Sequence, residues 1–330
     1  MKKGSQLFDL GGSGARELEL LTGLWYASSP FRLIEGEIVQ AEREVRGLVG
    51  SALFERAAAV YQSGGGEGEP APPWRGEAGA SAWESYYAML TDALRLPVAL
   101  LAIARYSRQT DISHEATGRK AKMDDNERSP FQWQIDRDDR ELRERYYRSL
   151  DALYELLEEG ADPDWERARE LQGFGESIVR DIRQLEAVYP VDGSRYVFYR
   201  LLPLVIERQR SDLEPRCGGK WADIAAGTAP ERVLALARRA AVLGAVITAA
   251  RRWSLEVFPL EIARRFSPTY QGDRANKAAL IEEIDWHAGL LDRERKDALD
   301  ALAELLAEGP AGAARAEPEN CRRNKYFTTE

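Results

Sequence analysis

Apolar residues along most of this chain recur every three or four positions, which is the spacing of amphipathic helices. Between residues 31 and 49 they fall at Leu33/Ile34, Ile38, Ala41, Val45 and Leu48/Val49. Gly50 follows directly, where glycine commonly ends a helix. The same pattern predicts further helices at about 15–21, 52–62, 82–107, 131–159, 164–171, 176–187, 196–213, 230–253, 260–265, 275–291 and 293–307. The one strand we expect is short and covers residues 6–10.

Three segments lack this periodicity. Residues 63–81 are rich in glycine and proline, which predicts a mobile surface loop. A polar stretch before residue 131 leads into the long helix at 131–159, and we expect residues 310–330 to form an extended C-terminal arm. Alanine, leucine, glutamate and arginine dominate the composition, and all four favour helix. The predicted fold class is therefore all-α.

The chain also repeats itself. LDALYELLEEG at 150–160 matches LDALAELLAEG at 299–309, and nine of the eleven positions are identical. The helix from Phe31 aligns with the one from Tyr199, so that Gly50 falls on Gly218. Upstream, ARELELL at residues 15 to 21 resembles VRDIRQL at residues 179 to 185. The alternative is that helices rich in leucine and glutamate resemble each other by composition alone.

Because the matches keep the same order, we expect two tandem, duplicated helical-bundle units. The first unit would cover residues 1–162, including the loop at 63–81, and the second 163–309, followed by the arm at 310–330. The distance between matching segments falls along the chain. We attribute this to the glycine-rich loop and to a longer polar stretch, both expected only in the first unit.

Charge and composition narrow the classes of protein. The 330 residues are enough for two ordinary domains, and a net charge of −9 disfavours general attraction to nucleic acid. Cys217 and Cys321 form neither a metal-ligand spacing nor a disulfide framework, which fits a reducing cytoplasm. The N-terminus lacks a signal peptide, and the longest apolar stretch, 240–250, is too short to span a bilayer. We therefore expect no membrane crossing.

No catalytic or nucleotide-binding fingerprint occurs in the sequence. The two histidines are His114 and His287. His114 with Asp111 and Glu115 could form a metal or acid–base cluster, but a loop histidine is the simpler interpretation. His287 could pair with Asp285 or Glu283, but a helix-surface residue is again the simpler interpretation. The sequence thus predicts no enzyme activity, no cofactor and no metal site.

The long helix at 131–159 carries carboxylates interleaved with arginines. Opposite charges three or four residues apart support each other, which favours a solvated or interfacial helix over a metal-binding loop. Its aromatic residues Phe131, Trp133, Tyr146 and Tyr147 are expected to anchor the helix to its own core.

The C-terminal arm ends in a β-prone aromatic segment after a basic pair. It is either a disordered tail or an arm that orders on a partner, with its aromatic side chains in pockets. The candidate docking residues are Arg322, Arg323, Asn324, Lys325, Tyr326 and Phe327.

Three blocks of sequence carry a family resemblance: residues 95–158, residues 189–205 and the terminal NKYF at 324–327. In these blocks the chain resembles an uncharacterised family of tailed-phage and prophage structural proteins, encoded among the genes for head-to-tail joining. The resemblance implies a non-enzymatic virion protein, a connector or neck adaptor that completes the head. It identifies no catalytic residues.

The resemblance also implies partners and a place. Adaptors of this kind are helical and form homo-oligomeric rings of about twelve subunits. Their partners would be the portal and the tail or neck proteins, with DNA passing through the channel without sequence-specific binding. The protein would be assembled in the host cytoplasm and end in the neck of the virion. A phage-derived injection device or a gene-transfer particle fits the same residues.

Two other classes remain open. The first is a cytoplasmic helical adaptor or regulatory protein that is not part of a particle. The second is an enzyme with an unrecognised active site, which a deep pocket around His114 or His287 would favour.

Overall fold

The computed structural model describes residues 4–9, 12–25, 29–62, 80–110, 112–115, 118–121, 131–252 and 281–307. The longer helices in this part of the chain are α1 (Gly14–Thr22), α2 (Glu35–Val49), α3 (Ser51–Gln62), α4 (Ala80–Thr110), α5 (Gln132–Gly160), α6 (Pro163–Leu171), α8 (Arg195–Arg208), α11 (Glu231–Arg252) and α12 (Ile281–Ala307). Shorter turns of helix are η1 (Phe31–Leu33), η2 (Phe174–Glu176), α7 (Ile182–Glu186), η3 (Gln209–Leu213), α9 (Glu214–Cys217), η4 (Gly218–Lys220) and α10 (Trp221–Ala226). The fold is all-α, as predicted.

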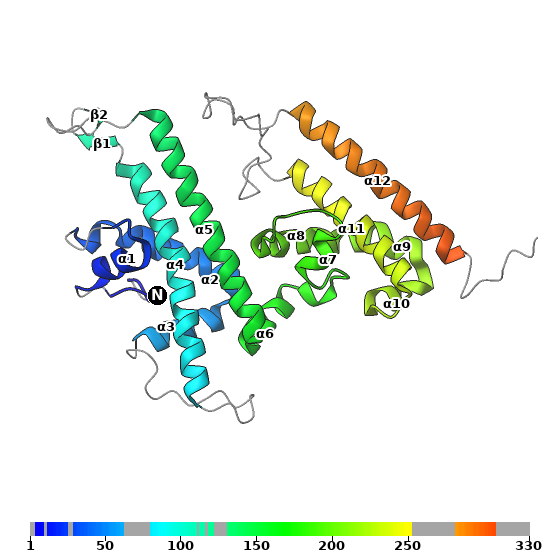
Figure 1. Cartoon of the computed structure of the whole chain (residues 1–330), viewed down its shortest axis with the longest axis horizontal. Coiled ribbons are helices and arrows are strands. Elements are labelled where there is room, and N and C mark those ends of the chain that lie inside the picture. The colour runs from blue at the N-terminus through cyan, green and yellow to red at the C-terminus, as the bar shows by residue number, and fades with distance from the viewer. Residues whose placement is uncertain are drawn as a thin grey trace, which may run out of the picture.

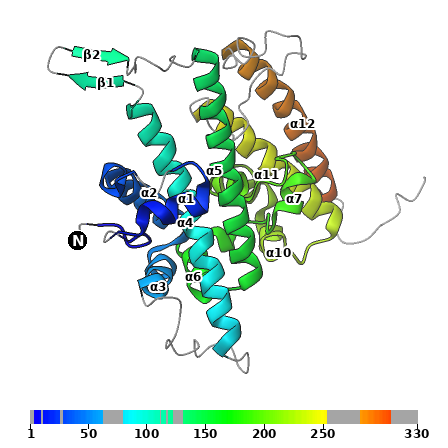
Figure 2. The same cartoon turned by 60° about the vertical axis from the view of Figure 1, so that its left-hand side comes forward.

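The main helices follow one another in a similar order in the two halves of the molecule. In the first half α4 packs against α5, and α1, α2 and α3 pack against α4 (Figure 1). In the second half α11 packs against α12, and α7, α8 and α10 pack against α11. Figure 2 shows the α4–α5 pair beside the α11–α12 pair, and the two helices of each pair are antiparallel. A short helix, a longer helix and a long antiparallel pair thus occur twice in sequence.

The halves share one hydrophobic core, because α5 of the first packs against α8 of the second. Trp165 of α6 lies between them, with its ring centroid 5.7 Å from that of Tyr154 and 5.3 Å from that of Tyr199. The carboxylate of Asp151 accepts hydrogen bonds from the backbone N–H of Tyr196 (2.8 Å) and the hydroxyl of Ser194 (3.0 Å). It therefore caps the first turn of α8.

A glycine with positive φ follows a helix in each half, and the one in the first half, Gly50, stands where the sequence predicts a helix end. Gly50 follows α2 with φ +94°, and Gly218 follows α9 with φ +52°. Both conformations are poorly accessible to residues with a side chain. At Gly50 a Cβ would also lie 2.8 Å from the Cβ of Ala168, so α6 can approach only because no side chain is present.

Several predicted elements are wrong. The described part of the expected strand, residues 6–9, is irregular, because the amides of Gln6 and Leu7 bind the side chain of Glu42 in α2 instead of a neighbouring strand. The helix expected at 176–187 shrinks to α7, and residues 177–181 are extended or irregular. The two helices expected around residue 292 form one helix, α12.

The polar stretch before α5 contains a hairpin that was not predicted. Strands β1 (Ile112–Glu115) and β2 (Gly118–Ala121) pair antiparallel there. The segment 253–280, which precedes α12, lies outside the described residues, so the expectation that the longer polar stretch occurs only in the first half stays a prediction. The expected helix at 260–265, most of the loop at 63–81 and the arm at 310–330 lie outside the described residues.

Within the part of the chain that the structure describes, two helices are long and apolar enough to cross a membrane: Tyr86–Thr110 and Glu231–Arg252. Of their apolar windows, 56% and 72% respectively are buried inside the protein. Core helices of proteins outside membranes pass the same test, so this finding is weak evidence for a membrane span.

Candidate functional site

A well-connected polar site lies where the N-terminal segment wraps around the carboxylate of Glu42 in α2. Oε1 of Glu42 accepts hydrogen bonds from the hydroxyl of Ser5 (2.6 Å) and from the backbone N–H groups of Gln6 and Leu7 (both 2.9 Å). Glu42 is only 5% exposed. Burial raises the pKa of its carboxyl group, although the hydrogen bonds from Ser5, Leu7 and Gln6 act in the opposite direction.

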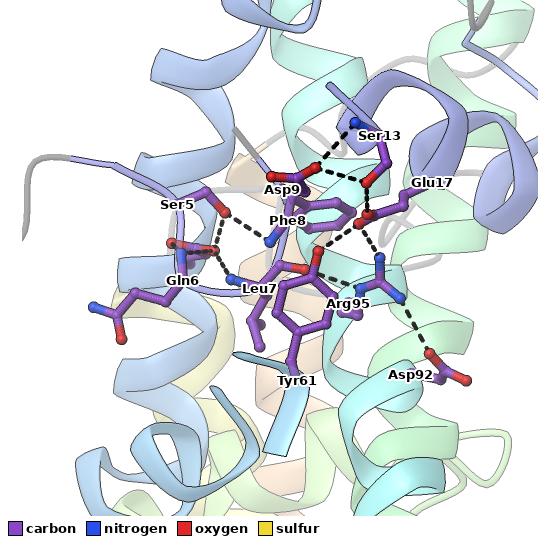
Figure 3. Close-up of polar contacts among 11 residues, drawn as sticks. Ser5, Gln6, Leu7, Phe8, Asp9, Ser13, Glu17, Tyr61, Asp92 and Arg95 are labelled. Atoms are coloured by element: carbon purple, nitrogen blue, oxygen red, sulfur yellow. Dashed lines mark hydrogen bonds and ion pairs between the residues drawn. The ribbon is translucent and has the colours of Figure 1, made fainter. Parts of the chain in front are cut away.

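Arg95 of α4 holds the same segment from the other side (Figure 3). Its Nε donates to the carbonyl oxygen of Leu7 at 2.9 Å, and its Nη2 forms an ion pair with Glu17 of α1. The guanidinium lies 5.0 Å from the ring centroid of Phe8 and 4.8 Å from that of Tyr61. The hydroxyl of Tyr61 donates to Glu17 at 2.8 Å. Burial and the contact with Glu17 raise the pKa of Tyr61.

The second half contains the same arrangement at Ile178. The backbone N–H of Ile178 donates to Oε1 of Gln209 at 2.8 Å. Its carbonyl oxygen accepts from Nε of Arg238 in α11 at 3.2 Å. Gln209 is 2% exposed and also donates from Nε2 to the carbonyl oxygen of Glu176 at 3.0 Å.

We call these sets the first clamp (Leu7, Glu42, Arg95) and the second clamp (Ile178, Gln209, Arg238). In each clamp, the backbone N–H of a buried apolar residue donates to a side chain. In the first clamp this side chain comes from α2, which ends before Gly50, and in the second it comes from η3, whose helical stretch ends before Gly218. The C=O of the same apolar residue is held by an arginine from the next long helix. Each clamp ties a segment to two helices that are distant in sequence.

An aspartate lies between each clamp and the short helix that follows it, and its carboxylate accepts a hydrogen bond from a backbone N–H. Asp9 accepts from the backbone N–H of Ser13 at 3.1 Å just before α1. Asp181 accepts from the backbone N–H of Gln184 at 2.9 Å and caps α7. Each segment thus contains two consecutive apolar residues, Leu7–Phe8 or Ile178–Val179, the first of which is held by the clamp. An aspartate that accepts a hydrogen bond from a backbone N–H further along the chain follows in both segments.

The surroundings of the two clamp arginines differ. Beside Arg238 lies a groove of about 490 Å³ between α7 and the start of α11. Its lining residues are Asp181, Arg183, Gln184, Ala187, Val188, Glu231, Ala235, Leu236, Arg238 and Arg239. In the first half, the ring of Tyr61 covers Arg95.

A second hollow, of about 260 Å³, lies between the end of α8, α11 and α12, and four of its lining residues are Arg208, Arg251, Arg252 and Arg295. Carboxylates already pair with these arginines. Arg252 binds Glu207 at 2.6 Å, and Arg295 binds Asp212 at 2.6 Å. The hydrogen bond from Arg252 lowers the pKa of Glu207. This network ties three helices together.

The candidate docking residues Arg322, Arg323, Asn324, Lys325, Tyr326 and Phe327 lie outside the described residues. His114 pairs with Arg119 in the register of the hairpin, and only its backbone is described. His287 is half-buried on α12, and the neighbouring Asp285 lies 3.8 Å from Arg251. Within the described ranges, no group of histidine, cysteine, aspartate and glutamate could hold a metal ion.

The aromatic residues of α5 divide into two groups. Tyr146 and Tyr147 pack against the core as predicted. Phe131 and Trp133 are 69% and 47% exposed, so the expectation that they anchor the helix is wrong. The reason is that the first turns of α5 extend past the end of α4 (Figures 1 and 2). Trp286, near the start of α12, is 67% exposed in a similar position of the second half.

No family model, curated protein or solved structure matches this chain. The resemblance to phage head-to-tail joining proteins therefore stays a prediction.

Proposed function

We propose that this chain is a non-enzymatic structural protein, a connector or neck adaptor that forms a ring between the portal and the tail of a phage-like particle. The observation that supports this most is the pair of matching clamps. They make each half a braced helical unit, and the chain carries two such units in one body.

We also propose that the two halves arose by tandem duplication. Composition explains why two helices look alike, but it does not explain why Leu7 and Ile178 have the same two kinds of partner. Those partners come from corresponding helices, and each lies more than thirty residues from the residue it holds. A repeated unit explains the repeated clamp, although the clamp residues do not fall on each other at the spacings of the sequence matches.

A body with two like units suits a closed ring. Repeated head-to-tail contacts between copies close into a ring when the rotation between copies allows it. Phe131, Trp133 and Trp286 supply exposed aromatic surface near the starts of α5 and α12. Aromatic side chains are enriched in the buried centres of protein interfaces. These residues are our candidates for the contact between copies.

The net charge of −9 agrees with a channel that lets DNA pass, because like charge disfavours sticking. The resemblance in residues 95–158 and 189–205 adds the location, the neck of a virion, and the portal and tail proteins as partners. It also suggests a ring of about twelve copies.

The experiment is native mass spectrometry of the full-length protein, with a double variant, Trp133→Arg with Trp286→Arg. We expect a closed oligomer of high order that falls apart in the double variant. Leu171→Arg is the control, because Leu171 is apolar and even more exposed than the two tryptophans but lies in α6. A protein that is monomeric at all concentrations contradicts the proposal and favours a helical adaptor outside any particle.

A further inference from the structure

The two clamps differ in what covers their arginines. In the first half, the ring of Tyr61 lies 4.8 Å from the guanidinium of Arg95, and its hydroxyl donates to Glu17. Arg238 is the counterpart of Arg95, and among the described residues no aromatic ring lies over it. Arg238 instead lines the open groove and pairs with Glu231 at 3.0 Å.

The reason for this difference is the length of one helix. Tyr61 is contributed by the last turn of α3, which runs to Gln62 before the chain reaches α4. The corresponding helix of the second half, α10, ends at Ala226, and α11 begins at Glu231. The second half therefore has no counterpart of the turn that carries Tyr61.

The groove offers the same kinds of group that Tyr61 contacts in the first half, an arginine for the ring and a carboxylate for the hydroxyl. Four small or apolar side chains, Ala187, Val188, Ala235 and Leu236, offer contact area to a ring. The guanidinium of Arg238 can stack on the face of an incoming aromatic ring. The carboxylates of Asp181 and Glu231 can accept from a hydroxyl group on that ring or pair with a basic side chain next to it in sequence. At about 490 Å³ the groove has room for more than one side chain.

We propose that this groove is the seat of the C-terminal segment of a neighbouring copy, with Tyr326 stacked on Arg238 as Tyr61 stacks on Arg95. The choice of a neighbouring copy rests on the proposed ring. Arg322, Arg323 and Lys325 precede this tyrosine and complement Asp181 and Glu231 in charge. Phe327 adds a second ring.

The place where the segment starts makes this binding feasible. The Nζ of Lys220 donates to the carbonyl oxygen of Leu306 and holds the end of α12 beside α10. The chain continues for 23 residues after Ala307. A fully extended stretch from Ala307 to Tyr326 spans about 60 Å, which is long enough to reach the groove of an adjacent molecule.

The test uses the full-length chain with the photo-reactive amino acid p-benzoylphenylalanine in place of Tyr326. Unlabelled and ¹⁵N-labelled copies are mixed, allowed to exchange and irradiated, and the cross-linked peptides are identified by mass spectrometry. We expect cross-links to residues 181–188 or 231–239 that join labelled to unlabelled chains. Cross-links within one chain overturn the neighbouring copy as the source. Cross-links elsewhere, or none, overturn the groove as the seat.

A blocking variant makes the result specific. Ala235→Trp places a large side chain in the groove from an exposed position, and we expect the cross-link yield to fall by about tenfold. Ala222→Trp, on the exposed face of α10, should leave the yield unchanged. Equal yields in both variants overturn the proposal. The mass of the oligomer is measured on the same samples, so a ring without groove cross-links rejects only this inference, whereas a monomer rejects the proposed function.

Discussion

Arg95 and Arg238 make the same contact in the two halves of the molecule. Each donates from Nε to the carbonyl oxygen of a buried apolar residue: Leu7 at 2.9 Å and Ile178 at 3.2 Å. In both places a second side chain, Glu42 or Gln209, takes the N–H of that same residue. In each half, one residue, Leu7 or Ile178, is thus held through both its N–H and its C=O group. The stability of each half should depend on its own clamp.

Replacing Arg95 with alanine should lower the free energy of unfolding by about 2–4 kcal/mol. The change removes the hydrogen bond to Leu7 and leaves Glu17 without its cation in a mostly buried site. Urea denaturation measures this loss. Arg105→Ala is the matched control, since its ion pair with Glu44 is more exposed and should contribute less than about 1 kcal/mol. Equal losses in the two variants would contradict the role of the clamp.

Glu42→Gln should be tolerated, because the second clamp already uses glutamine in this role. The amide oxygen can still accept from the N–H of Leu7, and the cost of burying a charge disappears. We expect the free energy of unfolding at neutral pH to change by less than about 1.5 kcal/mol. Glu42→Ala leaves the buried amide of Leu7 unpaired and should cost about 2–3 kcal/mol. A glutamine variant as unstable as the alanine variant would rule out the equivalence of Glu42 and Gln209.

The pH dependence of the same variant gives an independent test. Burial raises the pKa of Glu42 in the folded protein above its ordinary value of 4.5. The folded state therefore holds the proton more tightly than the unfolded state, and this residue makes stability fall as pH rises from about 4.5 through the folded pKa. Denaturation of wild type and Glu42→Gln across this range should show the decline attributable to Glu42 only in wild type. Parallel curves would show that Glu42 does not titrate with a raised pKa.

Gly50→Ala should destabilise the protein more than Gly218→Ala. Both positions have positive φ, and a side chain there costs about 1–3 kcal/mol. Only at Gly50 would the new methyl group also meet Ala168, which adds about 1–3 kcal/mol of overpacking. Thermal or urea unfolding of the two variants decides the order. If Gly218→Ala is the more damaging, the close approach of α6 to Gly50 is not as described.

Trp165 is fully buried at the junction of the halves, and its indole N–H makes no hydrogen bond to the described residues. Trp165→Phe keeps an aromatic ring against Tyr154 and Tyr199 and removes the unpaired donor. We expect it to change the free energy of unfolding by less than about 1.5 kcal/mol. Trp165→Ala should cost about 3–5 kcal/mol, because it leaves a cavity. Similar losses in both variants, measured by urea denaturation, would indicate that the indole N–H is bound.

The helices could be predicted from sequence because their evidence is local. The spacing of Ile38, Ala41 and Val45 predicts α2, and Gly50 marks its end. Pro97 lies inside α4 without ending it, because the surrounding residues pack into the core. Such features depend on residues a few positions apart, so periodicity is sufficient.

The candidate site could not be predicted in the same way. Leu7 and Phe8 look like part of a strand, but the N–H and C=O of Leu7 are held by Glu42 and Arg95, which lie 35 and 88 residues further along the chain. Trp133 looks like a core residue, and it is exposed because α5 extends past its partner. The sequence match between residues 15–21 and 179–185 gives no signal of the clamps, because it places Asp181 on Glu17 and not on Asp9.

Hydrogen exchange at the amides of Leu7 and Ile178 tests the equivalence of the two clamps most directly. We expect both amides to be protected in the wild-type protein, as buried and hydrogen-bonded groups are. Arg95→Ala should speed exchange in residues 5–9 and leave 176–180 unchanged, and Arg238→Ala should do the reverse. A rise of about thirtyfold in each case corresponds to a loss of about 2 kcal/mol of local stability. If either amide exchanges freely in the wild type, or ignores the loss of its own arginine, the two halves are not clamped in the same way.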